Sequence, residues 1–284
     1  MTLPIIEPRQ TDFTQPPAIN PALTAQWLEA FLKDEIVGGR GIARAVVGLS
    51  GGVDSAVTAY LCARALGPKN VFGVRMPYTH SSPSSLTDAR LVTEAIGLNE
   101  CTIEITAAAD GYLSCEPDAD ARRRGNVLAR LRMLVLFDQS AKLNALPVGT
   151  GNKTERLLGY FTWHADDSPP VNPIGDLYKS QVWKLAEYLG VPKPLVDKAP
   201  SADLEANQTD EGDLGITYAK ADAVLTRILE GYTNDQLVAR GFDRSEVEIV
   251  RKRLDGTHWK RHLPTTAMLS NTAINEFYLR PVDF

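Results

Sequence analysis

The stretch AVVGLSGGVDS, residues 45–55, decides the fold. It opens with a short apolar run at 45–49, turns at Gly51 and Gly52, and continues into the helix-forming stretch 54–66. A strand that leads through a glycine turn into a helix is the repeating unit of α/β proteins. Because ligands of open α/β sheets bind at the carboxyl ends of the strands, this turn is the first candidate site.

Strand and helix patterns continue on both sides of this unit. Further strands are predicted at 71–74, 102–105 and 146–149, and helices at 22–37, 87–96, 126–143 and 179–189. Residues 150–155 and the Pro-, Asp- and Asn-rich residues 191–213 are interpreted as loops, with three short helices after them. The alternation predicts an α/β fold with an open, mostly parallel sheet and helices on both faces.

Prolines mark the N-terminal segment as a separate region. Five of them lie in the first 21 residues, where they disfavour a helix or a central strand: Pro4, Pro8, Pro16, Pro17 and Pro21. We therefore expect an extended arm over 1–21 and a single domain over 22–284, which ends in short helices and a tail. The basic run Arg122-Arg123-Arg124 is interpreted as a solvated loop without a role.

Composition excludes several classes of protein. The chain has 284 residues, of which 44% are hydrophobic, and 30 basic against 35 acidic side chains give a net charge of −5. Nothing in this balance favours a nucleic acid or an anionic membrane, and no apolar run is long enough to span a bilayer. Three cysteines without a Cys-x-x-Cys pair argue against a disulfide framework or a zinc site and are typical of the cytoplasm.

The turn at 50–55 has the chemistry of a phosphate site. Paired glycines let backbone amides approach an anion, and the helix that follows adds the positive end of its dipole. The hydroxyls of Ser50 and Ser55 can donate hydrogen bonds, and Asp54 can ligate Mg²⁺. The alternative is an ordinary strand-to-helix turn in which Asp54 caps the helix. The turn matches neither the Gly-x-Gly-x-x-Gly dinucleotide pattern nor a Walker A loop.

Ser-Gly-Gly-x-Asp-Ser after a strand resembles the pyrophosphate-binding loop of the N-type ATP pyrophosphatases. Further segments resemble, in the same order, the ammonia-dependent NAD synthetases of that superfamily: residues 125–133 (GNVLARLRM), 148–155 (VGTGNKTE), 172–179 (NPIGDLYK), 198–204 (KAPSADL), 208–211 (QTDE) and 214–218 (LGITY). The resemblance implies an adenine nucleotide alpha hydrolase-like, Rossmann-like three-layer fold. It also implies a homodimer that uses ATP, Mg²⁺, deamido-NAD and ammonia.

The resemblance also implies roles for individual residues. For ATP these are Gly48, Leu49, Ser50, Gly51, Gly52, Val53, Asp54, Ser55, Arg75, Thr150, Lys179 and Ser201. For deamido-NAD they are Asn126, Arg130, Trp163, Asp166, Trp259 and Lys260. Asp54 and Glu155 are the implied Mg²⁺ ligands. Lys179 and Asp166 are the implied catalytic groups, and Asp166 would accept a proton from ammonium.

Each of these residues also has an ordinary structural interpretation. Arg130 and Lys179 are otherwise solvated side chains on helices, Glu155 is an acid in a first helical turn, and Arg75 pairs with a surface acid. His164 and His258 are interpreted as structural. The chain departs from the family at three positions, with Trp163 in place of a lysine, Pro170 in place of an aspartate and Trp259 in place of a histidine.

The implied reaction joins the nicotinate carboxylate of deamido-NAD to AMP, releases pyrophosphate, and then amidates the adenylate with ammonia. The 44 residues before the first predicted strand are too few for a glutaminase domain, so we expect free ammonia or a separate partner as the nitrogen source. Two alternatives stay open. One is another ATP pyrophosphatase that amidates or thiolates a different acceptor, and the other is a nucleotide-binding relative or scaffold without catalysis.

Overall fold

A parallel sheet of four strands organises the computed structural model, which describes residues 12–79, 83–201, 209–262 and 265–269. The strands are β1 (Ala45–Gly48), β2 (Val71–Arg75), β3 (Asn99–Thr102) and β4 (Leu146–Val148), in the order β3-β2-β1-β4. All three pairings are parallel, which confirms the predicted α/β class. The carboxyl end of β1 therefore lies at the centre of one sheet edge, where the glycine turn follows it.

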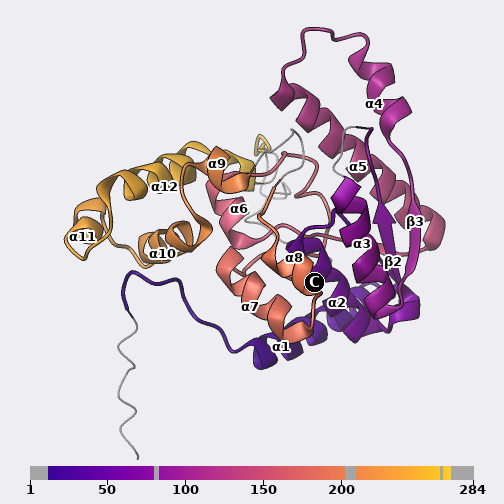
Figure 1. Ribbon diagram of the computed structural model, residues 1–284, viewed down its shortest axis with the longest axis horizontal. Coiled ribbons are helices and arrows are strands. Elements are labelled where there is room, and N and C mark those ends of the chain that lie inside the picture. The colour runs from indigo at the N-terminus through magenta and orange to yellow at the C-terminus, as the bar shows by residue number, and fades with distance from the viewer. Residues whose placement is uncertain (1–11, 80–82, 202–208, 263–264, 270–284) are drawn as a thin grey trace, which may run out of the picture.

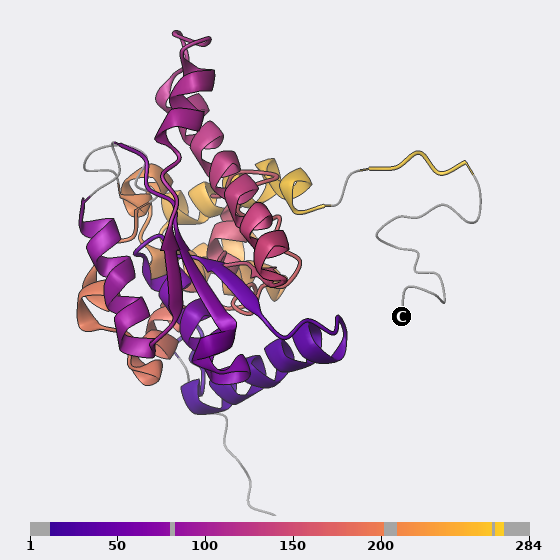
Figure 2. The same ribbon diagram turned by 90° about the vertical axis from the view of Figure 1, so that its right-hand side faces the viewer.

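Helices cover both faces of this sheet (Figures 1 and 2). The side chains of β1 alternate between the two faces, so each face has apolar residues that helices must bury. Ala45 and Val47 are buried against α1 (Pro21–Lys33), α2 (Val53–Leu66), α3 (Pro83–Ile96) and α7 (Lys179–Leu189). Val46 lies on the opposite face, in a cluster with Leu136 of α5 (Ala121–Leu143). The result is the predicted three-layer arrangement.

A second hydrophobic cluster lies beside the sheet, to the left in Figure 1. It is built from α6 (Lys153–Leu158), α9 (Asp210–Leu214), α10 (Tyr218–Leu229), α11 (Asn234–Val238) and α12 (Arg244–Gly256). Trp183 of α7 packs against both this cluster and the core under the sheet. Helix α7 therefore joins the two cores.

The other elements connect these layers. They are η1 (Asp34–Gly38, a π-helical turn), η2 (Pro68–Asn70), α4 (Thr106–Leu113), α8 (Lys193–Asp197) and η3 (His258–Arg261). No helix among the described residues has the length and apolar character to cross a membrane.

Several predicted boundaries were wrong. Strand β3 begins three residues before the predicted 102–105, because it is a polar edge strand whose side chains are mostly exposed. Helix α5 begins at Ala121, five residues early, because the carboxylate of Asp120 caps it by accepting from the amide of Arg123 at 2.7 Å. The run Arg122–Arg124 therefore belongs to the first turn of a helix rather than to a loop.

The predicted loops are also shorter than expected. Helix α6 begins inside 150–155, and α8 and the start of α9 interrupt 191–213. Residues 1–11 of the arm, 202–208 of the loop, 263–264 and the tail beyond 269 lie outside the described residues.

The described part of the arm is a strap between the two cores. Phe13 packs edge to face against Tyr232 and Phe242, with ring centroids 5.1 and 5.8 Å apart, and its backbone carbonyl accepts from Arg227 Nε at 3.1 Å. Four residues on, the carbonyl of Pro17 accepts from Gln181 Nε2 of α7 at 3.2 Å. Residues 13–17 thus connect the α10–α12 helices to the core under the sheet.

Phe13→Ala should lower the free energy of unfolding by about 2 kcal/mol, because it removes a half-buried ring and its edge-to-face contacts. Urea unfolding followed by circular dichroism measures the change. Tyr112→Ala is the control, since that aromatic side chain is 54% exposed, and its loss should stay below about 1 kcal/mol. Equal losses in the two variants would show that the strap adds no stability.

Candidate active site

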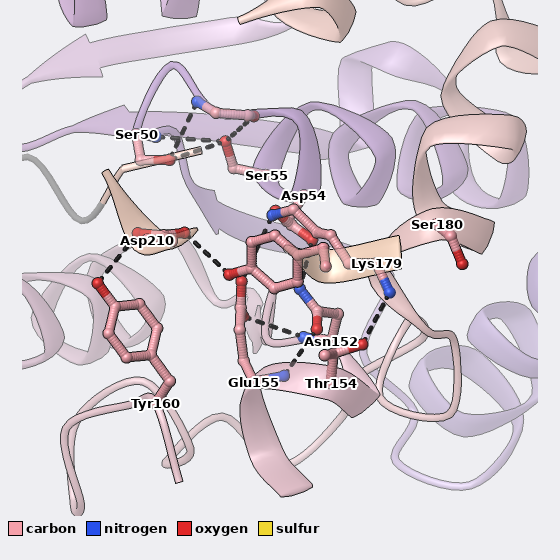
Figure 3. A network of polar contacts seen from close by, with 12 residues as sticks. Ser50, Asp54, Ser55, Asn152, Thr154, Glu155, Tyr160, Lys179, Ser180 and Asp210 are labelled. Atoms are coloured by element: carbon pink, nitrogen blue, oxygen red, sulfur yellow. Dashed lines mark hydrogen bonds and ion pairs between the residues drawn. The ribbon is translucent and has the colours of Figure 1, made fainter. Parts of the chain in front are cut away.

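The turn after β1 is shaped for an anion. Gly51 has φ +79°, and a Cβ placed on it would lie 2.4 Å from the backbone oxygen of Ser85, so only glycine fits. Ser55 Oγ donates to the carbonyl of Gly52 at 2.9 Å and lies 3.2 Å from Ser50 Oγ, which holds the turn in shape (Figure 3). The N-cap of α2 is Gly52, which has no side chain to cover the first helical amides. The positive end of α2 is therefore free of a capping group of its own.

Three helices bring charged side chains together beneath this turn. Lys179, the first residue of α7, has a side chain only 3% exposed, and its ammonium contacts Asp54 of α2 and lies 3.4 Å from Glu155 Oε1 of α6 (Figure 3). A buried ammonium needs such partners, because an unpaired charge in the interior is costly. The resemblance named all three residues, and the structure brings them into one cluster.

Asn152 fixes the two carboxylates relative to each other. Its amide nitrogen Nδ2 donates to Asp54 Oδ1 at 2.9 Å, and its Oδ1 accepts from the backbone amide of Glu155 at 2.9 Å. The side chain of Glu155 in turn accepts from the amide of Asn152 at 3.4 Å, which completes a capping box at the start of α6. Asn152 is fully buried, so this link is shielded from water.

A third carboxylate lies in the same cluster. Asp210, the first residue of α9, is 5% exposed and accepts hydrogen bonds from Tyr218 Oη at 2.9 Å and from Tyr160 Oη at 3.1 Å. The ammonium of Lys179 lies 5.2 Å from the centre of the Tyr218 ring. When ionised, the three carboxylates outnumber the one cation, so the cluster carries an excess of negative charge.

Burial and this excess charge shift the titration of the cluster. Burial raises the pKa of Glu155 to about 8, against the attraction of Lys179, and the charges of Asp54 and Asp210 act in the same direction as burial. Although burial disfavours its ammonium form, the carboxylates of Asp54 and Glu155 raise the pKa of Lys179. The site therefore keeps Lys179 charged and favours the protonated form of Glu155 until further positive charge arrives.

The carboxylates of this cluster suit a metal ion that is also coordinated by phosphate and water oxygens. Throughout the described residues, no three His, Cys, Asp or Glu side chains are grouped closely enough to hold a metal by themselves. Asp54 and Glu155 provide two carboxylates beside an anion-binding turn. Proteins usually bind Mg²⁺ through one or two carboxylates, and phosphate oxygens and water complete its coordination. The high pKa of Glu155 is consistent with a carboxylate that gains a cation on binding.

The residues implied for deamido-NAD meet around a second segment, 159–167. Arg130 Nη2 of α5 donates to the carbonyl of Trp163 at 3.2 Å, and Lys260 Nζ of η3 donates to the carbonyls of Gly159, at 2.7 Å, and Phe161. From the same segment, Thr162 Oγ1 donates to Asn126 Oδ1 at 3.0 Å and the amide of Thr162 donates to Asp166 Oδ2 at 2.7 Å.

Two of the residues that depart from the family pattern touch each other. The rings of Trp163 and Trp259 pack edge to face with centroids 5.2 Å apart, and Trp259 is 51% exposed. The ring of His164, whose φ is +58°, lies 3.9 Å from that of Trp163. Pro170, the third residue that differs from the family pattern, is exposed and lies in the loop after segment 159–167.

Arg75, Thr150 and Ser201 are further residues that the resemblance implies for ATP. Arg75 pairs with Glu100 of β3 at 2.9 Å, as its ordinary interpretation predicts. Thr150 follows β4 and is half-buried, and Ser201 is exposed.

Sequence reasoning missed several residues of the cluster. Asn152 carried a signal, because Asn three residues before Glu is a capping-box spacing. Asp210 and Tyr218 lie within the quoted segments 208–211 and 214–218, but no individual role was predicted for them. Asp222 lies outside every quoted segment and reaches this region only through the packing of α10.

Comparison with known proteins places the chain in a known group. The sequence model of the family described as NAD synthase matches residues 24–264. A curated NH₃-dependent NAD⁺ synthetase from Trichlorobacter lovleyi is 48% identical over 260 residues, which cover 90% of this chain and 94% of the relative. One from Fusobacterium nucleatum is 48% identical over 230 residues, which cover 81% of this chain and 89% of the relative.

Solved structures agree with the sequence matches. An NH₃-dependent NAD synthetase from Campylobacter jejuni, in complex with the nitrate ion, aligns with a TM-score of 0.75 at 32% identity, covering 88% of this chain and 100% of that one. An NMN synthetase from Francisella tularensis aligns with a TM-score of 0.78 at 32% identity, covering 88% of this chain and 99% of that one.

Gly51→Ala should weaken ATP binding at least about tenfold, equivalent to about 1.4 kcal/mol, because the added Cβ displaces the turn from the backbone of Ser85. Isothermal titration measures the affinity. Gly67→Ala is the matched control, since Gly67 also has positive φ (+86°) but open space around its Cβ. The control should lose stability and keep its ATP affinity, and unchanged ATP binding by Gly51→Ala would disprove the role of the turn.

Proposed function

Because the chain belongs to the NAD synthase family, we propose that it is an ammonia-dependent NAD synthetase, a ligase that forms a carbon–nitrogen bond. The observation that carries this function is the convergence of Asp54, Glu155 and Lys179 beneath a turn shaped for an anion. A site for the triphosphate of ATP requires an anion-binding turn, a cation and carboxylates for a metal, and the cluster supplies each of them.

The proposed reaction has two steps. An oxygen of the nicotinate carboxylate bonds to the α-phosphorus of ATP, and the bond between the α-phosphorus and the bridging oxygen breaks to release pyrophosphate. Ammonia then bonds to the carbonyl carbon of the adenylate, and the carbon–oxygen bond to AMP breaks. A carboxylate is already nucleophilic, so binding, alignment and charge stabilisation are the work left to the protein.

Two elements of the chain would stabilise the departing pyrophosphate. The N-terminal end of α2 follows the turn at the carboxyl end of β1, and Lys179, whose ammonium contacts Asp54 in the first turn of α2, adds a full positive charge there. Together with Arg75, Thr150 and Ser201, the residues 48–55 and Lys179 form the proposed ATP site. Burial of Lys179 supports this role, because a desolvated cation interacts with phosphate more strongly than an exposed one.

We propose Mg²⁺ as the cofactor, with Asp54 and Glu155 as its protein ligands. When bound, Mg²⁺ would neutralise part of the charge on the phosphates. The pair of carboxylates, fixed by Asn152, supports this assignment.

The second cluster is the proposed deamido-NAD site, with Asn126, Arg130, Trp163, Asp166, Trp259 and Lys260. The guanidinium of Arg130 suits a carboxylate or phosphate. Asp166 would accept a proton from ammonium. We further propose that the protein acts in the cytoplasm as a homodimer and that 22–284 form a single domain behind the arm at 1–21.

Product analysis tests this function. With deamido-NAD, ATP, Mg²⁺ and ammonium, we expect NAD, AMP and pyrophosphate in equal amounts, and no comparable rate with glutamine. Nicotinic acid mononucleotide serves as a second acceptor, because one similar structure is an NMN synthetase. Pyrophosphate release that needs a tRNA or a nucleobase would identify another ATP pyrophosphatase, and ATP binding without release for any acceptor would identify a non-catalytic relative.

Lys179→Met should lower kcat about a hundredfold or more, the usual cost of removing a group that stabilises a transition-state charge. Steady-state NAD formation measures the loss. Lys184→Met on the same helix is the matched control, because the Lys184 side chain is 66% exposed and pairs with Glu187. Comparable losses in both variants would contradict a specific role for Lys179.

Mg²⁺ affinity should depend on pH through Glu155. Below its pKa of about 8 this carboxyl holds a proton that the metal must displace, so apparent affinity should rise about tenfold per pH unit from pH 6 and level off above 8. Titration of Mg²⁺ in the presence of a non-hydrolysable ATP analogue measures this. Glu155→Gln should remove the dependence, and a wild-type affinity that is constant from pH 6 to 8 would refute the assignment.

A further inference from the structure

A buried carboxylate outside the proposed ligand-binding residues links the elements that carry Glu155 and Lys179. Asp222 of α10 is fully buried, as is its partner Thr154, which directly precedes Glu155. We propose that Asp222 is a positioning residue that, through Thr154, holds α6 and α7 in the alignment that Glu155 and Lys179 need to bind ATP with its metal. This inference rests on the proposed function and extends it.

The contacts form a continuous relay between three helices. Thr154 Oγ1 donates to Asp222 Oδ1 at 2.5 Å, and the same hydroxyl accepts from the backbone amide of Lys179 at 2.9 Å. The other carboxylate oxygen, Asp222 Oδ2, accepts from the backbone amide of Ser180 at 2.8 Å. The first two amides of α7 therefore depend on Asp222, one directly and one through Thr154 (Lys179 and Thr154 are shown in Figure 3).

The relay supplies acceptors for the first two amides of α7. The N-cap residue of this helix, Tyr178, makes no side-chain cap. The local bond at this end runs from the amide of Tyr178 to Gln181 Oε1 at 2.9 Å, and it leaves the amides of Lys179 and Ser180 to the relay. A carboxylate at this position also complements the positive end of the helix dipole. The start of α7 is therefore fixed by a residue 42 positions further along the chain.

The location of the relay makes it more than a cap. The relay is joined directly to two charged residues of the site. Thr154 is the residue before Glu155, and the amide that donates to Thr154 Oγ1 is that of Lys179. A displacement of α6 against α7 would change the distance between Glu155 Oε1 and Lys179 Nζ, which is 3.4 Å here. Side chains of a preorganised site tolerate little such displacement.

Burial and hydrogen bonding act in opposite directions on the pKa of Asp222, and together they leave its side chain ionised at neutral pH. Burial raises the pKa of Asp222 to about 6, while the hydrogen bonds from Thr154 and Ser180 and the charge of Lys179 oppose that rise. At neutral pH the carboxylate form predominates, and both of its oxygens have donors.

Two substitutions break the relay at different points. Thr154→Val removes the hydroxyl and keeps the shape of the side chain. Asp222→Asn replaces one of the two carboxylate oxygens by an amide nitrogen and removes the negative charge, so it weakens the bonds that Asp222 accepts from Thr154 Oγ1 and from the amide of Ser180. Thr154→Ser keeps the hydroxyl as the conservative rescue.

The chain offers a matched control on the same helix. Thr226 Oγ1 donates to the backbone carbonyl of Asp222 at 2.7 Å, so Thr226→Val removes a threonine hydroxyl that bonds the same residue but not its carboxylate. A purely structural role for the relay predicts similar effects of Thr154→Val and Thr226→Val.

The readout is the affinity for α,β-methylene-ATP with Mg²⁺, measured by isothermal titration without deamido-NAD and well below the melting temperature. We expect about tenfold weaker binding for Thr154→Val and Asp222→Asn, near wild-type binding for Thr154→Ser and Thr226→Val, and no further loss in the double variant Asp222→Asn/Thr154→Val. In NAD formation, KM for ATP should rise by the same factor while KM for ammonium stays constant.

The proposal is overturned if Thr154→Val binds the analogue within about twofold of wild type, or if Thr226→Val loses as much affinity as Thr154→Val. If Asp222→Asn does not fold, Thr154→Val and its serine rescue decide. A wild-type protein that binds the analogue but forms no NAD refutes the proposed function, and the binding series still tests the relay separately.

Discussion

The buried ammonium of Lys179 is the interaction on which the site depends. It contacts Asp54 of α2 and lies 3.4 Å from Glu155 of α6, so one side chain of α7 ties together the starts of three helices. A cation with 3% exposure is stable only with such partners, and the carboxylates in turn need the cation. Charge pairing and the arrangement of the helices are therefore a single structural requirement.

The sheet makes this pairing possible. Because β1 and β4 are parallel neighbours, the turn that precedes α2 and the loop that precedes α6 leave the sheet at the same edge. Asn152 then bonds across the gap from the start of α6 to Asp54. Helix α7 adds the third member, and Trp183 on it packs against both hydrophobic cores. The second core contributes Asp210, Tyr218 and Asp222 to the same region, so it forms one wall of the site.

Sequence patterns predicted the parts of the structure that local chemistry controls. Residues 45–66 and 179–189 combine apolar periodicity with clear ends, and their strand and helices formed within one residue of the expected bounds. Strand β3 was displaced by three residues because an edge strand such as 99–102 exposes Asn99 and Glu100 and shows no apolar alternation. In the site, Asp54, Glu155 and Lys179 were found through their motifs. Asp222 was not, because only tertiary packing brings it to Thr154, 68 residues away in the chain.

The strap at 13–17 has a consequence for how the chain folds during synthesis. Phe13 is translated more than two hundred residues before its partners Arg227, Tyr232 and Phe242. The nascent chain can complete the β1–α2 unit early, because its contacts are local, whereas the strap closes only after residues 227–242 have left the ribosome. Closure of the strap therefore requires that the second core has already been synthesised.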